Sequence, residues 1–429
     1  MKKNFFVGIF LLLTFSGHTQ VLSKTEKKIL KNIDADMTAT WQLLKESVNI
    51  NSGTFNIAGV KKVGELYAKE LAALGFTVEW IALPDSLKRA GHLVAFKKGT
   101  KGKKLFLIGH LDTVFEPAMP LNPFTILNDS TATGQGINDM KGGDVLVIAA
   151  LKAMYKEGLL KNVNITVYFT GDEEKAGEPN SVSRADFIER ARHHTVGLAF
   201  ETAAGLNKVA TARRGVSEWK LQAEGKQAHS SGVFGTSGYG AIYEAARIIN
   251  TFREKLSQEL YLTFNPGLFI GGSEIKYDDT SQKGSSSGKT NIISPQTVVI
   301  GDLRFLTEDQ KQKTRENMQQ IVSQHLPGTN ASIIFKDNIP SMPPTAGNQN
   351  LVKDLSAISL ALGYGEVKAG DPGSRGAGDI SYVASYMDCL DGLGASGKGA
   401  HAPGETMNMY DYPKLIKRAA IMIYRLTSQ

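Results

Sequence analysis

The sequence contains almost no cysteine: Cys389 is the only one among 429 residues. A single cysteine cannot form an internal disulfide, which removes cross-links as a source of stability. The apolar residues around it favour packing in a core over nucleophilic catalysis. Stability must therefore come mainly from surface buried on folding.

A large excess of charge of either sign is also absent. The chain has 49 Lys and Arg against 42 Asp and Glu, a formal net charge of +7. The basic residues are spread along the chain and aromatic residues are not interleaved with them, which argues against a nucleic-acid-binding surface. The mild excess still permits a weak attraction for anionic substrates.

A long apolar run occurs only near the N-terminus. Lys2 and Lys3 precede the apolar residues Phe5 to Phe15, and small or polar residues follow from Ser16 to Gln20. This pattern resembles a secretory signal peptide and predicts a secreted or periplasmic protein. The run is short for a membrane crossing, although an uncleaved anchor is the alternative. Removing residues 1–20 deletes two lysines and no acids, which lowers the formal charge from +7 to +5.

Length and composition predict a globular protein of two domains. A chain of 429 residues usually exceeds one compact core, and 41% hydrophobic with 21% charged residues is ordinary for soluble proteins. Strands alternate with helices from Lys24 to Thr170, which predicts an α/β domain containing βαβ units.

The predicted order of helices and strands changes near residue 214. From Val216 to Lys336 the expected order of elements is β-α-β-β-α-β, the ferredoxin-like (α+β) arrangement. The Ser-, Gly- and Lys-rich segment from Tyr277 to Lys289 is expected to be a mobile loop within it. The predicted organisation is therefore a signal peptide (1–20), a larger domain in two parts (21–213 and 341–429) and an inserted domain (214–340).

Residues able to bind metals follow three predicted buried strands. Each apolar run is followed by its polar residues: Lys104 to Ile108 by His110, Ile165 to Phe169 by Glu173 and Glu174, and Val196 to Phe200 by Glu201. Ligands of open α/β sheets gather at the carboxyl ends of parallel strands, so we expect one shared site. Taken singly, each has a simpler explanation as a core histidine, an acidic surface turn or a strand-end charge.

Three further residues extend this set. Asp112, two residues after His110, lies on the same side of an extended segment and can orient the imidazole. Asp139 precedes a Met-Lys-Gly-Gly turn; it either caps a helix or offers one oxygen to each of two cations. His401 lies in a glycine-rich loop, with a surface histidine as the alternative. Two histidines and three acids, with a spare glutamate, suit a pair of divalent ions.

The segments that carry these candidate ligands closely resemble those of a known family, the dinuclear zinc peptidases. This family includes glutamate carboxypeptidases, aminoacylases and deacylases of amino-acid biosynthesis. The sequence is most similar to the glutamate carboxypeptidases. The likeness covers the chain from about Lys24 to its C-terminus. The matching segments are Gly109 to Val114, Asn138 to Gly143, Asp172 to Glu174, Phe200 to Glu201 and His401 to Glu405.

The resemblance implies two zinc ions per subunit, with other divalent ions as alternatives. Asp139 would bridge the ions. His110 and Glu201 would complete one site, and Glu174 and His401 the other. It also implies a catalytic α/β domain built on a mixed sheet, with an inserted ferredoxin-like dimerisation or lid domain.

The same resemblance assigns the remaining chemistry. Glu173 would be the general base, which takes a proton from a water held between the ions and later protonates the departing nitrogen. Asp112 would support the ring of His110, and the peptide bond between Asp139 and Met140 would be cis.

Residues of the predicted insert would recognise the substrate. His229 matches a family histidine that reaches across a dimer to stabilise the oxyanion, which implies a homodimer formed through the insert. Asn291 and Arg304 resemble groups that hold the substrate carboxylate, for which the arginine fork is suited. A solvent-facing histidine and a surface ion pair are the respective alternatives for His229 and Arg304.

Two arginine segments leave specificity open. Gly373 to Asp379 lies where the family often has a Gly-Gly-Thr-Asp turn, and Arg375 departs from that pattern. Arg375 either binds a substrate acid or pairs with an aspartate of the loop. Arg213 and Arg214 are interpreted as solvated charges at a domain-boundary hinge, with a position facing the pocket as the alternative.

The sequence as a whole predicts an exported zinc-dependent exopeptidase or amidase. Its substrate would be a small peptide or acyl-amino acid with a free carboxylate, and the glutamate-carboxypeptidase branch is favoured. An aminoacylase or dipeptidase is the second hypothesis. A non-catalytic ligand-binding relative is a third, against which the complete ligand set and Glu173 argue.

Overall fold

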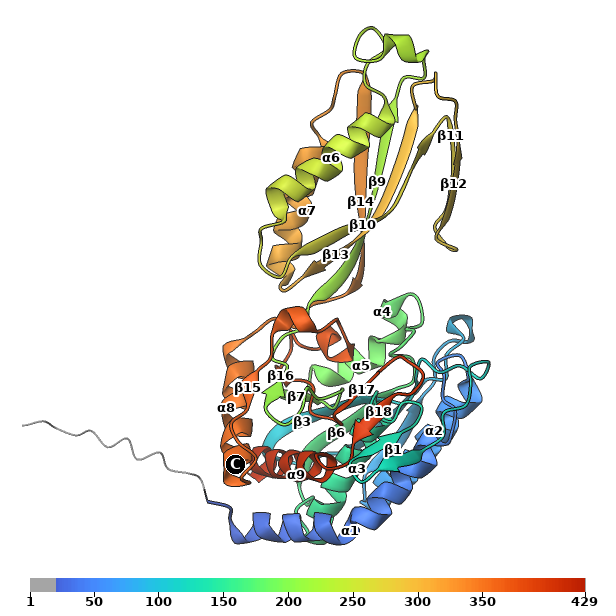
Figure 1. Ribbon diagram of the computed structural model, residues 1–429. Coiled ribbons are helices and arrows are strands. Elements are labelled where there is room, and N and C mark those ends of the chain that lie inside the picture. Colours follow the sequence, from blue (N-terminus) through green and yellow to red (C-terminus); the bar gives the residue numbers. More distant parts are fainter. Residues whose placement is uncertain (1–20, 429) are drawn as a thin grey trace, which may run out of the picture.

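The computed structural model describes residues 21–428, in two units that each carry their own sheet (Figure 1). The predicted signal peptide, residues 1–20, lies outside the described residues. Within the described part of the chain, no helix is long and apolar enough to cross a membrane.

The larger unit is built on a six-stranded mixed sheet in the order β1-β2-β6-β3-β7-β16. β6, β3, β7 and β16 run parallel, whereas β2 pairs antiparallel with β6 and with β1. This confirms the predicted α/β class with a mixed sheet. The strands are β1 (Thr77–Ile81), β2 (His92–Lys97), β3 (Lys101–His110), β6 (Val163–Thr170), β7 (Val196–Ala199) and β16 (Asp388–Leu390).

Apolar residues on both faces bury this sheet. Along β3, Leu105 and Leu107 belong to one core and Phe106 and Ile108 to another, because successive side chains of a strand point to opposite faces. α1, α3 and α9 pack together on the first core, and α5 lies over the second. The helices are α1 (Lys24–Val48), α2 (Ile57–Ala73), α3 (Lys141–Lys156), α4 (Asn180–Ser183), α5 (Ala185–Ala191), α8 (Ala346–Ala361) and α9 (Tyr412–Ser428).

Local signals fix the ends of these helices. Ser23 caps α1 and forms a reciprocal capping box with Glu26. Glu26 Oε1 also accepts a hydrogen bond of 2.6 Å from Arg425 Nε, which ties the first helix to the last.

Short 3₁₀ turns lie at η1 (Asp85–Leu87), η2 (Ser230–Gly232), η3 (Pro372–Ser374) and η4 (Asp379–Tyr382).

The smaller unit has an antiparallel sheet in the order β10-β13-β9-β14. Along the chain its elements follow the predicted β-α-β-β-α-β order, and Figure 1 shows both helices on one face of the sheet. Alternate residues of β9, such as Trp219 and Leu221, are buried beneath them. The elements are β9 (Gly215–Gly225), α6 (Ala241–Leu256), β10 (Thr263–Gly272), β13 (Gln296–Phe305), α7 (Glu308–Val322) and β14 (Thr329–Ile339).

The segment expected to be a loop between Tyr277 and Lys289 is instead mostly a hairpin. β11 (Glu274–Asp278) and β12 (Lys283–Ser287) pair antiparallel over five residues each. Serine and glycine there need no buried face, because backbone hydrogen bonds form the ladder whatever the side chains. Composition alone therefore hid the strands.

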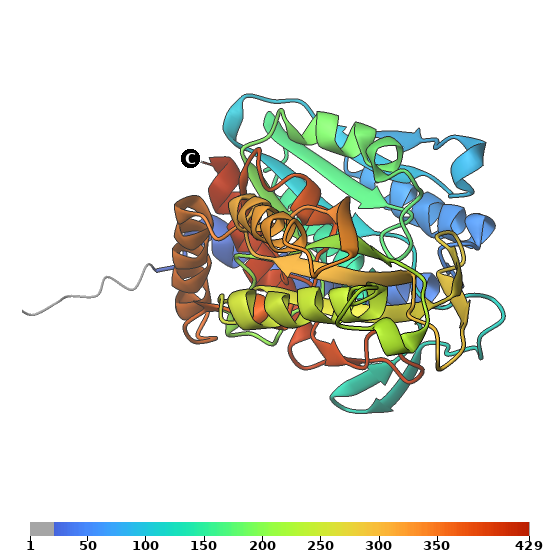
Figure 2. The same ribbon diagram turned by 90° about the horizontal axis from the view of Figure 1, so that it is seen from above.

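The chain passes between the two units twice, at adjacent points. Arg213 N donates to Met342 O at 2.9 Å, and Met342 N donates to Arg213 O at 3.0 Å. Seen from above, the smaller unit projects over the larger one (Figure 2). The two crossings thus form a short double connection.

Short strands that the sequence did not indicate complete the larger unit. β4 (Thr125–Asn128), β5 (Thr131–Thr133), β17 (Gly397–Lys398) and β18 (Thr406–Asn408) form a small sheet, and β8 (Lys208–Val209) pairs with β15 (Lys368–Ala369). β18 pairs with β5 and so brings the loop that holds His401 beside the loop that holds Asp139. This small sheet positions part of the site described next.

Candidate metal centre

Three adjacent parallel strands deliver the predicted ligands to one edge of the central sheet. β3 lies between β6 and β7 and ends at His110. Glu173 and Glu174 follow β6, and Glu201 follows β7. The expectation that these strand ends meet is confirmed.

Two groups of side chains share Asp139. In the first, His110 Nε2 lies 3.3 Å from Asp139 Oδ1 and 3.5 Å from Glu201 Oε1. In the second, His401 Nε2 lies 3.1 Å from both Asp139 Oδ2 and Glu174 Oε2. The potential ligand atoms within each group all lie within 4.8 Å of one another. Two oxygens of one carboxylate therefore face two separate groups, as a bridging ligand requires.

Asp139 sits in a turn before α3 and does not cap that helix. The N-cap residue is Met140, which makes no side-chain cap bond, so the capping alternative for Asp139 is wrong. The Asp139–Met140 peptide bond is cis. After the turn, Gly143 lets α3 approach the end of β7, because a Cβ there would stand 2.0 Å from Phe200 O.

Glu405 holds this turn in place. Its carboxylate is fully buried and accepts backbone hydrogen bonds from Gly136 at 2.9 Å, Asn138 at 2.7 Å and Asp139 at 2.8 Å. Burial raises the pKa of Glu405 to about 7, while these bonds act in the opposite direction. The sequence marks Glu405 only by its place four residues after His401, so its role was missed.

Asp112 contacts the ring of His110, as predicted, and supports the site by a second route as well. His110 Nδ1 lies 3.0 Å from the backbone oxygen of Asp112 and 3.6 Å from its carboxylate. The carboxylate also accepts hydrogen bonds from the backbone N–H groups of Glu173 at 3.0 Å and Glu174 at 3.1 Å, and from the hydroxyl of Thr54 at 2.6 Å. Asp112 therefore links the His110 strand to the turn that carries both glutamates.

Glu173 lies beside the two ligand groups and belongs to neither. Burial raises its pKa well above the ordinary glutamate value; His110 opposes this effect, and Glu201 and Asp379 add to it. A carboxylate with a raised pKa near other acids is suited to accept and return a proton.

A second network lies beneath the Glu173 turn. Arg184 Nη1 donates to Asp172 at 2.5 Å, and Arg184 Nε donates to Asp379 at 2.8 Å. Thr170 Oγ1 donates to the other oxygen of Asp379 at 2.5 Å. All four side chains are buried, so the acids on either side of the turn are neutralised by one arginine.

The charge of the ligand groups fits bound cations. Burial would raise the pKa of Asp139, but hydrogen bonds with His110 and His401 hold it well below its usual range. Hydrogen bonds to Asp139 and Glu174 raise the pKa of His401 to about 11. Glu174 Oε1 is buried without a hydrogen-bond partner. Three carboxylates, one with an unpartnered oxygen, and two imidazoles form a donor set that divalent ions complete.

Arg375 lies close to this centre but is partnered. Its guanidinium donates to the backbone oxygen of Thr202, the residue after Glu201. Arg304 forms an ion pair of 2.9 Å with Asp302 in its own strand, which is the surface-pair alternative. No substrate contact of either arginine follows from this geometry alone.

Arg213 differs from its prediction as a solvated hinge charge. The residue is only 6% exposed and pairs with buried Asp391. Its neighbour Arg214 contacts the insert, where Nη1 donates to Thr263 Oγ1 at 3.2 Å. The prediction was wrong because Asp391 is far away in the sequence and the fold alone brings the pair together.

His229 and Asn291 lie together at the far end of the insert. Ser230 N donates to Asn291 O at 2.9 Å, and both predicted side chains are exposed. β9 starts at the crossing between the units, and its eleven residues span roughly 35 Å before this point. Figure 1 shows this end of the insert directed away from the larger unit. One subunit therefore does not bring His229 or Asn291 to its own ligand groups.

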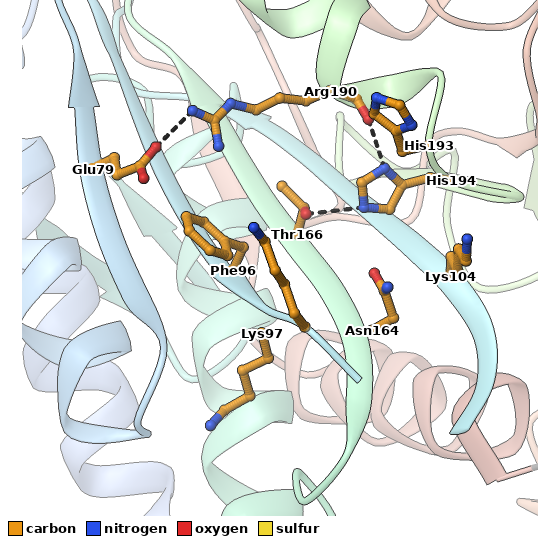
Figure 3. Close-up of a pocket in the computed structure, with 10 residues that line it drawn as sticks. Glu79, Phe96, Lys97, Lys104, Asn164, Thr166, Arg190, His193 and His194 are labelled. Carbon is orange, nitrogen blue, oxygen red and sulfur yellow. Dashed lines mark hydrogen bonds and ion pairs between the residues drawn. The ribbon is translucent and has the colours of Figure 1, made fainter. Parts of the chain in front are cut away.

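A cavity of about 570 Å³ lies at the opposite edge of the central sheet (Figure 3). Lys104 and Asn164, near the starts of β3 and β6, line it. On its buried side His194 Nδ1 faces Arg190 O and Nε2 faces Thr166 Oγ1, each at 2.9 Å. Burial lowers the pKa of His194 to about 4, so the imidazole is neutral. This cavity is not part of the metal centre.

Comparison with known proteins identifies a family and several relatives. The model of peptidase family M20/M25/M40 matches residues 106–425. Carboxypeptidase G2 of Pseudomonas sp. is 26% identical over 426 residues, 98% of this chain and 97% of that protein. Succinyl-diaminopimelate desuccinylase of Polynucleobacter necessarius is 26% identical over 299 residues, 67% of this chain and 74% of that protein.

A solved structure shares the fold. Aminopeptidase PepT from Bacillus cereus superposes with a TM-score of 0.68 at 17% identity, covering 94% of this chain and 98% of that one. At this identity the likeness establishes the shared fold alone.

Proposed function

Because the chain belongs to peptidase family M20/M25/M40, whose members are metal-dependent hydrolases of peptide and amide bonds, we propose that it releases a C-terminal glutamate-like residue from a small peptide or acyl-amino acid. The observation that carries this proposal is the position of Asp139 between two ligand groups beside Glu173. Full-length similarity to carboxypeptidase G2 supports the choice of glutamate.

We assign one ion to His110, Asp139 and Glu201, and the other to Asp139, Glu174 and His401. Imidazole and carboxylate donors suit zinc, with other divalent ions as alternatives. When bound, the ions would polarise the scissile carbonyl and lower the pKa of the attacking water.

Glu173 is the proposed general base. Its carboxylate takes a proton from the attacking water and returns it to the departing nitrogen, a transfer that its raised pKa favours. Asp112 keeps Glu173 in place by accepting its backbone N–H at 3.0 Å. No covalent enzyme intermediate is needed.

Substrate recognition is proposed to require two subunits. Asn291 precedes β13 and Arg304 lies near its end, so the ten residues of that strand separate them by roughly 30 Å. A single insert cannot place both on one small substrate. We assign Arg304 to the site of its own subunit, and His229 and Asn291 to the site of the partner in a homodimer.

The hydrogen bonding of His229 suits a role as a donor to the oxyanion in the partner's site. Its Nδ1 accepts a hydrogen bond of 3.2 Å from Ser231 N, so a neutral ring carries its proton on Nε2. The side chain is exposed at the tip of the insert. An N–H directed outward can stabilise an oxyanion in another subunit.

A deacylase or dipeptidase is the second candidate function. Similarity to a desuccinylase over 67% of the chain favours cleavage of an acyl-amino acid, and the ligand groups serve either reaction equally. Arg375, which donates to the backbone oxygen of Thr202, has no assigned substrate contact in either candidate function.

A substrate panel separates these candidates. N-acyl-glutamates, N-acetyl amino acids and simple dipeptides are compared by kcat/KM after metal analysis of the same preparation. We expect glutamate release to be fastest. Turnover of dipeptides without release of glutamate would remove the first candidate.

Subunit mixing tests the shared site. Protomers with His229→Ala and with Glu173→Ala are each expected to be inactive, and random exchange is expected to restore roughly a quarter of the activity, since half of the dimers regain one complete site. Absence of recovery in dimers shown to exchange would contradict a histidine acting across the interface.

Export is proposed on the N-terminal pattern alone. Lys2 and Lys3 followed by Phe5 to Phe15 predict cleavage near residue 20. Mass spectrometry of the N-terminus after expression with the native leader tests this proposal, and an intact leader would favour the anchor alternative.

A further inference from the structure

Arg213 is buried at the point where the chain first crosses between the two units. Its backbone pairs with Met342, the residue of the return crossing, and the whole residue is 6% exposed. A guanidinium at that depth requires partners for its charge and its N–H groups. The partners of Arg213 lie in segments next to the metal centre.

The guanidinium connects two segments of the larger unit. It pairs with the carboxylate of Asp391, and its Nη1 donates to Ala377 O at 2.9 Å and to Gly376 O at 3.4 Å. Asp391 is itself fixed, because its backbone N–H donates to Ala210 O at 2.9 Å. Arg213 therefore fastens the glycine-rich turn that begins at Gly376 to a rigid part of the sheet.

The same guanidinium approaches the proposed base. A Cβ on Gly378 would stand 2.3 Å from Arg213 Nη1 and 3.5 Å from Glu173 Oε1, so both atoms surround one point. Gly378 has φ −165°, which any residue adopts. The position therefore requires glycine for space, and both Arg213 Nη1 and Glu173 Oε1 border that space.

The charges agree with this geometry. Burial would lower the pKa of Arg213, but Asp391 first, and then Glu201 and Glu173, raise it. A positive charge near a carboxylate limits the orientations that the carboxylate adopts. Arg213 therefore acts on Glu173 through its charge.

We propose that Arg213 is a positioning residue whose charge, across the space at Gly378, favours the orientation of the Glu173 carboxylate needed for proton transfer. The proposal rests on the proposed role of Glu173 as general base. Because Arg213 acts through Glu173, its displacement changes turnover rather than substrate binding. Its place at the crossing also links the base to the connection that carries the insert.

Gly378→Ala is the variant that tests this. The added methyl group meets the end of a flexible side chain, so the guanidinium must move while the backbone stays. We expect kcat to fall about tenfold or more, since small misplacements of a catalytic group cost that much. KM and metal content are expected to stay near the wild-type values.

Gly376→Ala is the matched control in the same turn. A Cβ there would meet nothing within 4 Å, so its kinetics are expected to be unchanged. Arg213→Lys, which keeps the charge but loses the fork, is expected to lower kcat with little change in KM.

Each other outcome overturns the inference. An unchanged kcat in Gly378→Ala removes the positioning role. A raised KM at constant kcat would make Arg213 a substrate ligand, and loss of metal would make its role structural. If the wild type turns over no substrate of the panel, or if Glu173→Gln is fully active, the proposed function itself fails. An inactive Glu173→Gln beside a normal Gly378→Ala overturns only the inference about Arg213.

Discussion

The two units of this molecule treat buried charge in opposite ways. At the metal centre, burial raises the pKa of Glu173 well above its usual value and that of Asp112 to about 7. Asp144, behind the centre, is fully buried, and neither of its carboxylate oxygens has a hydrogen-bond partner. In the insert, buried Glu244 is paired with Arg247 at 2.7 Å and accepts the backbone N–H of Leu326 at 3.0 Å.

Acids at the metal centre lack partners for part of their charge, as expected of a site that binds cations. Glu244 of the insert has its partners within the fold. An unpaired buried acid is costly, and it persists where a cation, a proton or a function compensates for it. The insert shows no such cost at Glu244, since its partners satisfy the charge. Experiments that alter metal, acid or pH should therefore affect the two units differently.

The largest effect is expected from Glu173→Gln. Loss of a general base lowers kcat by about 10³-fold, while the ligand groups stay intact and metal content is unchanged. Because one of several crowded acids is neutralised, the melting temperature should stay constant or rise. Exposed Glu189→Gln is the control, and a clear fall in stability would contradict the picture of an acid-rich site.

Removal of metal comes next. An ion present at a thousand times its Kd stabilises the fold by about 4 kcal/mol, which chelation removes. Hydrogen exchange should accelerate at the ends of β3, β6 and β7 and stay unchanged in β9 and β13. Equal acceleration in both sheets would break the comparison.

A smaller loss is expected from Glu405→Gln. The amide keeps one acceptor oxygen and sets an NH₂ group against one of the three backbone donors, which costs about 2 kcal/mol. Metal affinity should fall about 10- to 100-fold, because the turn of Asp139 loses its support. Titration of apoprotein with zinc measures this, with exposed Glu366→Gln as the control.

The smallest effect belongs to Glu244→Gln in the insert, about 1.5 kcal/mol at pH 7 with metal content unchanged. Burial raises the pKa of Glu244, but the bonds from Arg247 and Leu326 N lower it overall. A lowered folded pKa gives stability that is present above the unfolded value of about 4.3 and is lost as pH falls through the folded pKa.

The difference between wild type and Glu244→Gln should therefore close in acid. Urea unfolding at pH 7, 5 and 3 tests this. A gap that stays constant over that range would show that the charge of Glu244 does not matter.

The ligand segments could be predicted because each is local. A buried strand followed by His110 or Glu201 places that residue at a known edge, and the element order of the insert follows from periodicity alone. Arg213 could not be predicted, since its partner Asp391 is brought to it only by the folded sheet. Glu405 was missed for the same reason, because its donors lie near residue 137.

The composition of the segment from Tyr277 to Lys289 led to a wrong prediction of a loop. The hairpin of β11 and β12 is rich in serine and glycine, which favour turns when no partner strand is known. The metal assignments, export and the dimer stay predictions that the experiments above address.

The double connection at Arg213 and Met342 has a consequence for how such a chain is assembled. The insert leaves and returns at residues joined by hydrogen bonds of 2.9 and 3.0 Å, so both of its ends connect to the larger unit at one insertion point. Another domain whose own ends lie equally close can be inserted there without disturbing the central sheet. The insert can thus be exchanged by recombination while the larger unit, with both ligand groups, is inherited whole.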